Sequence, residues 1–280
     1  NGQVNTNVNL TGETTSNYFG YAMTSGDFNA DGKTDLAVGA NKYSTDTGRA
    51  YIFYNDGSIP TTAATADVII TGETTNNYFG ASLTSGDFNA DGKTDLAVGA
   101  YTYSTSTGRA YLFYNDGSIP TTAATADVII TGEALSSFSI SLTSGDFNFD
   151  GKVDIAVGAS DYSSARGRAY IFYNDGSIPT TAATADVIIS ASGIDYVFGY
   201  SLASGDFNAD GRADLAVGAY DFNASFGFVH IFYNDGSIPT TEVTSDIKIT
   251  GESTSNFGTS LATGDFNSDG KTDLAVGAVA

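Results

Sequence analysis

The sequence has no cysteine, one histidine, one methionine and only four prolines among its 280 residues. Without cysteine the chain has neither a disulfide framework nor thiolate metal sites, although this absence does not fix the cellular compartment. With His230 as the one histidine and no cysteine nucleophile, no Ser-His-Asp or Cys-His catalytic set is expected, and His230 should have a packing or surface role. No stretch approaches 18 apolar residues, so no segment is expected to span a membrane.

Basic residues are also scarce. The chain has 11 lysines and arginines against 32 aspartates and glutamates, which gives a formal net charge of −21. A surface so poor in positive charge argues against the binding of nucleic acid or of anionic membranes. Aromatic residues and glycine are abundant instead, with 17 tyrosines, 18 phenylalanines and 33 glycines. This mixture is typical of many short strands joined by tight turns.

One motif, GDFNADGKTDLAVGA, repeats along the whole chain. It begins at residue 26 and returns with few changes at residues 86, 145, 205 and 264. A unit that recurs so regularly usually cannot bury its apolar face alone and must stack on its neighbours. We therefore predict a single domain over residues 1–280. Its repeats are expected at about 12–71, 72–131, 132–190, 191–250, and 251–280 plus 1–11.

Each repeat shows the same order of strand signals. In the first repeat, runs rich in Tyr, Phe, Ile and Val are bounded by Gly, Asn and Asp, at residues 19–28, 34–40, 49–55 and 67–71. The sequence Asn55-Asp56-Gly57 predicts a tight hairpin turn after the third run. No segment has the spacing of an amphipathic helix. We therefore predict an all-β protein, a β-propeller of about five four-stranded blades. A parallel β-solenoid is the alternative, disfavoured because its coils are shorter and because hairpins imply antiparallel neighbours.

The two ends of the chain each resemble part of one blade. Residues 7–13 (NVNLTGE) align with 67–73 (DVIITGE), so the chain should begin on a fourth strand, and it stops just after a second strand. The last blade then lacks a third strand, and its edge at residues 272–278 should be covered. We predict that the N-terminal strand completes this blade, in the same chain or from a neighbouring chain. The second arrangement would make a homo-oligomer or a filament. The start at Asn1, without an initiator methionine, fits a processed secreted protein and equally a fragment.

The acidic part of the motif has the composition of a calcium-binding loop. In the first copy the candidate ligands stand at positions 1, 3, 5, 7 and 9, with Gly32 permitting the turn. Carboxylate, amide and main-chain carbonyl oxygens suit Ca²⁺, whereas Mg²⁺ prefers to keep several waters. A chain of Asx turns is the structural alternative, but a turn needs no carboxylate at position 9, which all five copies keep. We expect about five Ca²⁺ ions. The candidate ligands are Asp27, Asn29, Asp31, Lys33 (through its carbonyl) and Asp35; Asp87, Asn89, Asp91, Lys93 and Asp95; Asp146, Asn148, Asp150, Lys152 and Asp154; Asp206, Asn208, Asp210, Arg212 and Asp214; and Asp265, Asn267, Asp269, Lys271 and Asp273.

The wider motif FGYAMTSGDFNADGKTDLAVGA resembles the FG-GAP repeat, with Phe19-Gly20 at one end and Gly39-Ala40 at the other. That repeat builds the β-propeller of integrin α subunits and of many bacterial secreted and surface proteins. The resemblance covers nearly the whole chain. It implies Ca²⁺ binding by the loops between the first and second strands of each blade, and an extracellular or cell-surface location. The third repeat departs from the pattern, with Phe138-Ser139 in place of Phe-Gly, and the fourth has the altered approach SASGIDYVFG.

The uniformity of the repeats favours a non-enzymatic module. Residues 55–73 and 115–133 are identical, whereas an active site would usually interrupt the repetition at one place. We expect an extracellular structural or adhesive protein, with a glycan or a surface protein as its ligand. A lectin-like propeller is the alternative, because aromatic residues suited to stacking on sugars recur after each Gly-Ala pair, although they could equally cover blade edges. These residues are Tyr43, Tyr103, Tyr162 and Phe222. A polysaccharide-cleaving enzyme is a third alternative.

Overall fold

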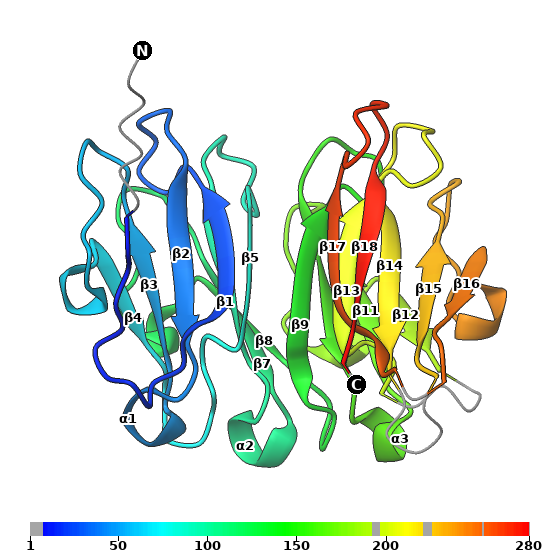
Figure 1. Ribbon diagram of the computed structural model, residues 1–280, viewed down its shortest axis with the longest axis horizontal. Coiled ribbons are helices and arrows are strands. Elements are labelled where there is room, and N and C mark those ends of the chain that lie inside the picture. The colour runs from blue at the N-terminus through cyan, green and yellow to red at the C-terminus, as the bar shows by residue number, and fades with distance from the viewer. Residues whose placement is uncertain (1–7, 192–196, 221–225, 254, 280) are drawn as a thin grey trace.

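The computed structural model describes residues 8–191, 197–220, 226–253 and 255–279. In this part the chain forms five antiparallel sheets, four with four strands and the last with two. The strands stand roughly side by side, and the acidic loops lie at one end of the molecule while three short turns, α1 to α3, lie at the other (Figure 1). None of the described helices is long and apolar enough to cross a membrane. The predicted five-bladed, all-β propeller is confirmed.

The strands follow one another in the same order in every blade. The first strands are β1 (Phe19–Gly26), β5 (Ser82–Gly86), β9 (Phe138–Gly145), β13 (Ser201–Gly205) and β17 (Phe257–Gly264). The second strands are β2 (Asp35–Ala40), β6 (Asp95–Ala100), β10 (Asp154–Ala159), β14 (Asp214–Ala219) and β18 (Asp273–Ala278). The third strands are β3 (Arg49–Phe53), β7 (Arg109–Phe113), β11 (Arg168–Phe172) and β15 (Phe228–Phe232). The fourth strands are β4 (Val68–Thr71), β8 (Val128–Thr131), β12 (Val187–Ser190) and β16 (Ile247–Thr250).

Short helical turns join these strands at equivalent places. The turns α1 (Tyr43–Asp46), α2 (Tyr103–Ser106) and α3 (Tyr162–Ala165) join second to third strands. The 3₁₀ turns η1 (Ala63–Thr65), η2 (Ala123–Thr125), η3 (Ala182–Thr184) and η4 (Glu242–Thr244) precede the fourth strands. The repetition of the sequence is therefore reproduced in every connection that the structure describes.

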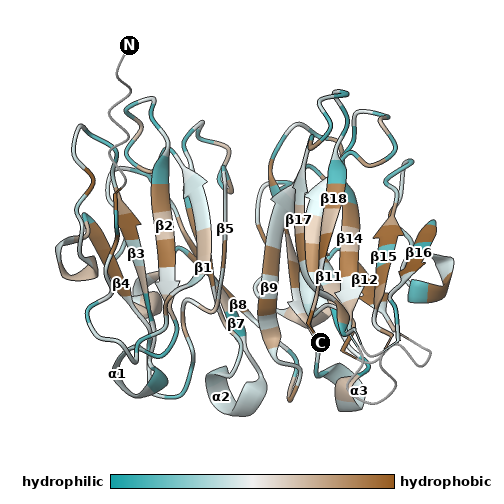
Figure 2. Cartoon of the chain, viewed as in Figure 1, coloured by the Kyte–Doolittle hydropathy of each residue, from teal (hydrophilic) through white to brown (hydrophobic). Residues whose placement is uncertain are grey.

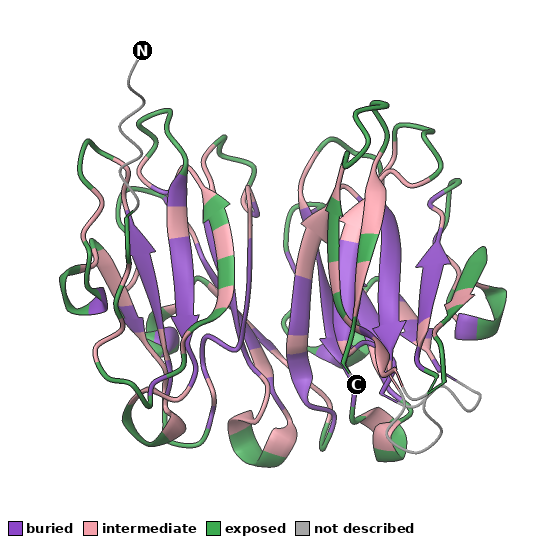
Figure 3. Ribbon diagram, viewed as in Figure 1, coloured by how far each residue is buried: buried purple, intermediate pink, exposed green. Residues whose placement is uncertain are grey.

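The first strands surround a central channel, and the ring of blades is open. Strand β1 contacts β5, and the same contact joins β5 to β9, β9 to β13 and β13 to β17. Residues of all five first strands line a central space of about 290 Å³. In the described part of the chain no comparable contact joins β17 back to β1. Consistent with an opening there, β1, β17 and β18 carry more exposed residues than the inner strands of the middle blades (Figure 3).

The hydrophobic core lies between adjacent blades. Apolar residues are most frequent on the inner strands of each sheet (Figure 2), and the buried side chains of neighbouring blades pack against one another. In the first four blades the phenylalanine at the start of the motif packs edge-on against two rings of the third strand. Phe79, for example, lies 5.5 Å from Tyr111 and 6.2 Å from Phe113, measured between ring centroids. In the fourth blade His230 takes the tyrosine position, with 1% of its surface exposed and its ring 5.7 Å from Phe198. The expected packing role of His230 is confirmed.

Ion pairs hold consecutive blades together at their outer side. The glutamate that follows the fourth strand of one blade reaches the arginine that begins the third strand of the next. The pairs are Glu73–Arg109 at 3.0 Å and Glu133–Arg168 at 2.8 Å, and Glu13 of the N-terminal segment makes the equivalent pair with Arg49 at 2.7 Å. This ion pair is not repeated between the third and fourth blades. Phe228 stands there in the arginine position, and the amino group of Lys248 lies over its ring at 3.9 Å. The glutamate and the arginine of each ion pair, called the clamp below, therefore come from different repeats.

Two details differ from the sequence prediction. Asn55-Asp56-Gly57 does not close a tight hairpin, because β3 ends at Phe53 and β4 begins only at Val68. The connection is long because it must pass through η1 and reach the preceding segment, where Thr11 and Thr62 form a parallel bridge. Gly57 does have a positive φ of 128°, as a turn residue would.

The N-terminal segment does not extend the last blade within this chain. Residues 8–10 form no strand, residues 1–7 lie outside the described residues, and β17 pairs only with β18. The reason is that the segment is held on the first blade. Leu10 packs against the cluster that contains Tyr51 and Phe53, and Glu13 accepts hydrogen bonds from Arg49 and Tyr51. The N-terminal segment lies on the first blade where, on each later blade, the end of the fourth strand from the preceding blade lies.

Candidate metal centre

All five acidic loops connect the first strand of a blade to its second strand. Position 9 of each loop is the first residue of the second strand, as Asp154 is for β10. The loops therefore project from the same end of the propeller, and strand pairing fixes where each one begins and ends. This placement agrees with the prediction from the sequence.

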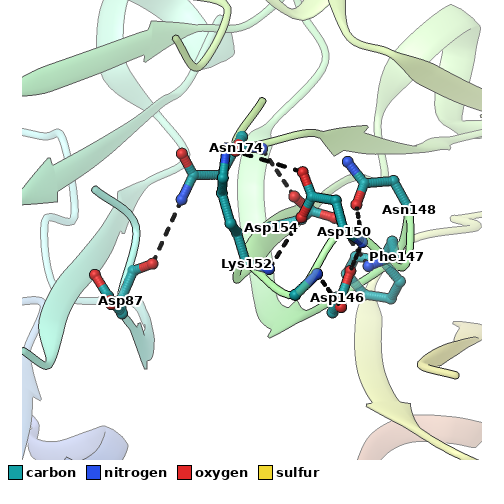
Figure 4. Close-up of polar contacts among 9 residues, drawn as sticks. Asp87, Asp146, Phe147, Asn148, Asp150, Lys152, Asp154 and Asn174 are labelled. Carbon is teal, nitrogen blue, oxygen red and sulfur yellow. Dashed lines mark hydrogen bonds and ion pairs between the residues drawn. The ribbon is translucent and has the colours of Figure 1, made fainter. Parts of the chain in front are cut away.

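Within a loop, the side chains at positions 1, 3 and 5 fold inward onto main-chain amides (Figure 4). In the third blade Asp146 accepts hydrogen bonds from the amide of Asp150 at 3.0 Å and from that of Gly151 at 2.8 Å. Asn148 accepts from the same Asp150 amide at 3.0 Å, and Asp150 accepts from the amide of Lys152 at 2.9 Å. The other four loops repeat these bonds, so the coiled shape predicted from the spacing is present in every copy.

In the first four blades the aspartate at position 9 is buried and ties the loop to the rest of its blade. Asp154 accepts from the amides of Phe147 and Asn174, both at 2.8 Å, and none of its surface is exposed. In the last blade Asp273 bonds within its own loop to Phe266 at 2.9 Å. That blade has no third strand to supply a counterpart of Asn174.

The pKa values of the position-9 carboxyls reflect this environment. Burial, opposed by the two amide hydrogen bonds and reinforced by the aspartates at positions 1 and 5, raises the pKa of Asp95 and of Asp154 to about 6. Burial likewise raises the pKa of Asp214. A buried carboxylate beside two further carboxylates disfavours its own charge unless a cation lies near. A bound cation would therefore reduce the repulsion between the carboxylates of each loop.

The side chain at position 7 differs between loops. Lys33 donates to the Asp31 carboxylate of its own loop at 3.1 Å. Lys93 and Lys152 each donate to a main-chain carbonyl at the end of the third strand, Asn115 and Asn174 respectively, both at 3.0 Å. Asn174 also approaches the carbonyl of Asp87 in the preceding blade, at 3.5 Å (Figure 4). In the second and third blades the lysine thus ties the loop to the end of its own third strand, and Asn174 and Asn234 each reach the loop of the preceding blade.

The residues present fit a hard cation by their chemistry. Each loop offers three carboxylates and one side-chain amide, whose oxygens keep lone pairs beyond those used by the amides. Such an all-oxygen donor set is the one that Ca²⁺ takes. Among the described residues, however, no three carboxylate or imidazole groups stand close enough together to hold an ion by themselves. Main-chain carbonyl and water ligands would have to complete the shell.

The aromatic residues proposed to stack on sugars are engaged otherwise. The guanidinium groups of Arg49, Arg109 and Arg168 lie over the rings of Tyr43, Tyr103 and Tyr162, at 3.7, 3.8 and 3.7 Å. Each arginine covers one face of its ring, as expected of aromatic residues that cover blade edges. The lectin-like alternative stays a prediction. Phe222 lies outside the described residues.

Sequence reasoning missed a different group of tyrosines, at the end of the central channel opposite the acidic loops. Tyr21, Tyr101, Tyr200 and Tyr220 line one pocket there. The available signal was their position: they stand beside the Phe-Gly and Gly-Ala pairs, where the repeats differ from one another.

The chain is similar to known proteins throughout its repeats. The family model described as the FG-GAP repeat matches residues 19–53, 79–113, 138–172, 198–232 and 257–278. Integrin alpha-PS2 of Drosophila melanogaster is 32% identical over 228 residues, covering 75% of this chain and 16% of that protein. Integrin alpha-5 of Xenopus laevis is 30% identical over 217 residues, covering 72% of this chain and 20% of that protein.

An enzyme also contains a similar region. Human phosphatidylinositol-glycan-specific phospholipase D is 32% identical over 180 residues, covering 58% of this chain and 21% of that protein. The chain thus spans about a fifth of the length of these curated relatives. Each of the five matched segments lies in one blade and begins at its Phe-Gly or Phe-Ser pair; four run to the end of the third strand and the fifth to the end of the second. The chain therefore belongs to the FG-GAP repeat family.

Proposed function

We propose that this chain is an extracellular, calcium-loaded propeller that acts as an adhesion module. The observation that carries the proposal is the set of five loops, each with three aspartates and one asparagine, fixed at one end of the propeller by strand pairing. In four of them the position-9 carboxylate is also buried. The similarity to integrin α chains supports an adhesive role on the outside of a cell. About five ions, one for each loop, would reduce the formal charge of −21 considerably.

A catalytic role has less support in the described residues. His230 is buried among aromatic rings, and many carboxylates outside the loops have structural roles that repeat from blade to blade. Asp67, Asp127 and Asp186, for example, each accept a hydrogen bond from the amide that follows a third strand. We therefore propose a binding function, and treat the phospholipase similarity as similarity in the repeat region alone.

Counting bound ions under native conditions in a mass spectrometer tests the metal part. We expect five Ca²⁺ ions on the full chain and four on the Asp91→Asn variant, which removes one charge from an exposed position without changing the side-chain shape. Asp116→Asn, also exposed but outside the loops, is the matched control and should keep five. Five ions on the Asp91 variant would show that this carboxylate is not a ligand.

Binding to an array of immobilised glycans and extracellular proteins tests the adhesive part. We expect binding in Ca²⁺ that is lost in EDTA, because the loops brace the blades that present the binding surface. Binding to no spot, or binding that EDTA leaves unchanged, would contradict the proposal.

Self-association is a second candidate function. Its specific observation is that β18 pairs with β17 on one side only, so its other edge has unpaired main-chain groups in the described structure. We propose that this edge accepts residues 7–10 of a second copy, giving head-to-tail assembly.

A further inference from the structure

Four tyrosines from three blades meet at the end of the central channel that carries the turns α1 to α3. Tyr21 follows the Phe-Gly pair of the first blade and Tyr101 follows the Gly-Ala pair of the second. Tyr200 and Tyr220 occupy both positions in the fourth blade. Together with residues of the third blade they line a surface pocket of about 180 Å³.

The tyrosine rings are close to one another. The centroids of Tyr200 and Tyr220 lie 4.4 Å apart, with the ring planes at 77°, and Tyr101 lies 5.5 Å from Tyr78. Burial, together with the neighbouring phenols of Tyr21, Tyr78 and Tyr200, raises the pKa of Tyr101 to about 12. Tyr101 is therefore neutral at physiological pH, and each of the tyrosines has an apolar ring and a hydroxyl group.

The third blade supplies a polar wall. Ser137 and Ser160 are 3% and 4% exposed, and Asp161 lies at the exposed rim. The hydroxyl of Ser137 donates to the carboxylate of Asp161, which holds that carboxylate at the pocket. Ile140 completes this side. The pocket thus has aromatic faces on one side and hydroxyl and carboxylate groups on the other.

The composition of this pocket is not repeated around the ring. The residue after Phe-Gly is Ala81 in the second blade and Ile140 in the third, and the residue after Gly-Ala is Asn41 in the first and Ser160 in the third. Residues 55–73 and 115–133, by contrast, are identical. The repeats are otherwise nearly identical, but their residues differ at this place and lie close together near the propeller axis. Such residues can form one asymmetric site.

We propose that this tyrosine pocket binds one ring of an uncharged saccharide. A pyranose has an apolar C–H face, which packs on an aromatic ring, and a rim of hydroxyls, which would bond to Ser160, Asp161 and the phenol groups. The volume is below the roughly 300–1,000 Å³ of pockets for drug-sized ligands, which suits a single ring. No lysine or arginine lines the pocket, so a phosphorylated or acidic sugar would find no counter-charge. The proposal names a ligand class for the adhesion module proposed above and rests on that function.

Saturation-transfer NMR on the full chain in Ca²⁺ provides the test. The probes are the methyl glycosides of glucose, galactose, mannose and N-acetylglucosamine, with glucuronic acid and lysine methyl ester as charged comparisons. We expect at least one neutral glycoside to bind and both charged probes to fail. Affinity for that glycoside should fall about tenfold or more in Tyr200→Ala and less in Tyr200→Phe, which keeps the ring face.

Tyr43→Ala is the matched control, because Tyr43 lies at the same end of the propeller but its ring is covered by Arg49. It should bind the glycoside as the unaltered chain does. Loss of sugar binding in Tyr200→Ala with the full number of Ca²⁺ ions retained would separate the pocket from the metal loops. Binding of no neutral glycoside, equal binding by Tyr200→Ala, or binding of the lysine ester alone would overturn the proposal, whether or not the chain is adhesive.

Discussion

Gly39 and Gly80 lie against each other across the junction between the first two blades. A Cβ atom on Gly39 would stand 2.0 Å from the carbonyl oxygen of Gly80, and Gly80 itself has a φ of +88°.

 A left-handed φ at Gly80 and the contact with Gly39 both exclude a side chain, because a Cβ would be strained at one glycine and would collide at the other. The same contact joins Gly158 to Gly199 and Gly218 to Gly258. The Phe-Gly pair of one blade thus packs on the Gly-Ala pair of the blade before it.

Gly39→Ala should therefore be clearly destabilising. We expect it to lower the free energy of unfolding by about 1–3 kcal/mol or more, since main-chain atoms must move to admit the methyl group. Gly277→Ala is the matched control in the last blade, where the nearest atom is the side-chain hydroxyl of Ser260 rather than a main-chain atom of another blade. Urea unfolding in Ca²⁺ measures both variants. An equal loss of stability in the two would contradict the blade-junction argument.

Ser139 shows how the third blade keeps this geometry without glycine. Its φ is +71°, and its hydroxyl donates to the carbonyl of Arg109 at 2.6 Å and accepts from the amide of Ala100 at 3.1 Å. Ser139→Ala should cost about 1–3 kcal/mol, because it keeps the unfavourable φ and leaves two buried main-chain groups without their partner. Ser139→Gly should cost less, since it relieves the backbone strain. Thermal or urea unfolding checks this order, and a more stable alanine variant would contradict it.

Removal of calcium should weaken the whole propeller. A site at ten times its dissociation constant adds ~1.4 kcal/mol, so five sites add ~7 kcal/mol if the unfolded chain binds none. EDTA should therefore lower the melting temperature strongly, and added Ca²⁺ should restore it. Mg²⁺ at the same concentration is the control and should restore less, because it releases its waters reluctantly. A melting temperature that EDTA leaves unchanged would contradict the calcium proposal.

The ion pairs between blades should contribute measurably to stability. Glu133→Gln replaces a partly buried carboxylate that accepts from Arg168 at 2.8 Å and from the hydroxyl of Tyr170 at 2.6 Å. We expect a loss of about 1–3 kcal/mol in the free energy of unfolding, the range for hydrogen bonds to charged groups. Glu252→Gln is the control, because Glu252 follows the fourth strand of its blade in the same way but is exposed. If the two variants lose the same stability, the clamp is not responsible.

The sequence predicted the blades well because each strand and loop is a local pattern repeated five times. The alternation of RAYIF and the carboxylates of DFNADGKTD are visible within a few residues, and the structure reproduces both. The clamp between Glu73 and Arg109 was not predictable in this way, since its halves are 36 residues apart and belong to different repeats. The tyrosine pocket was missed for the same reason: Tyr21, Tyr101 and Tyr200 meet only after the blades are arranged around an axis.

The unpaired edge of β18 leads to the last prediction. If residues 7–10 of one copy pair with β18 of another, the full chain should form rings or fibres in Ca²⁺, visible by electron microscopy. Deleting residues 1–12 should dissolve these assemblies into monomers, whereas deleting residues 1–6 keeps the pairing segment and should leave them intact. Ala275→Lys, which adds a charge at an exposed position of β18, should also prevent assembly without removing any N-terminal residue. A full-length chain that sediments as a monomer in Ca²⁺ would contradict strand exchange between copies.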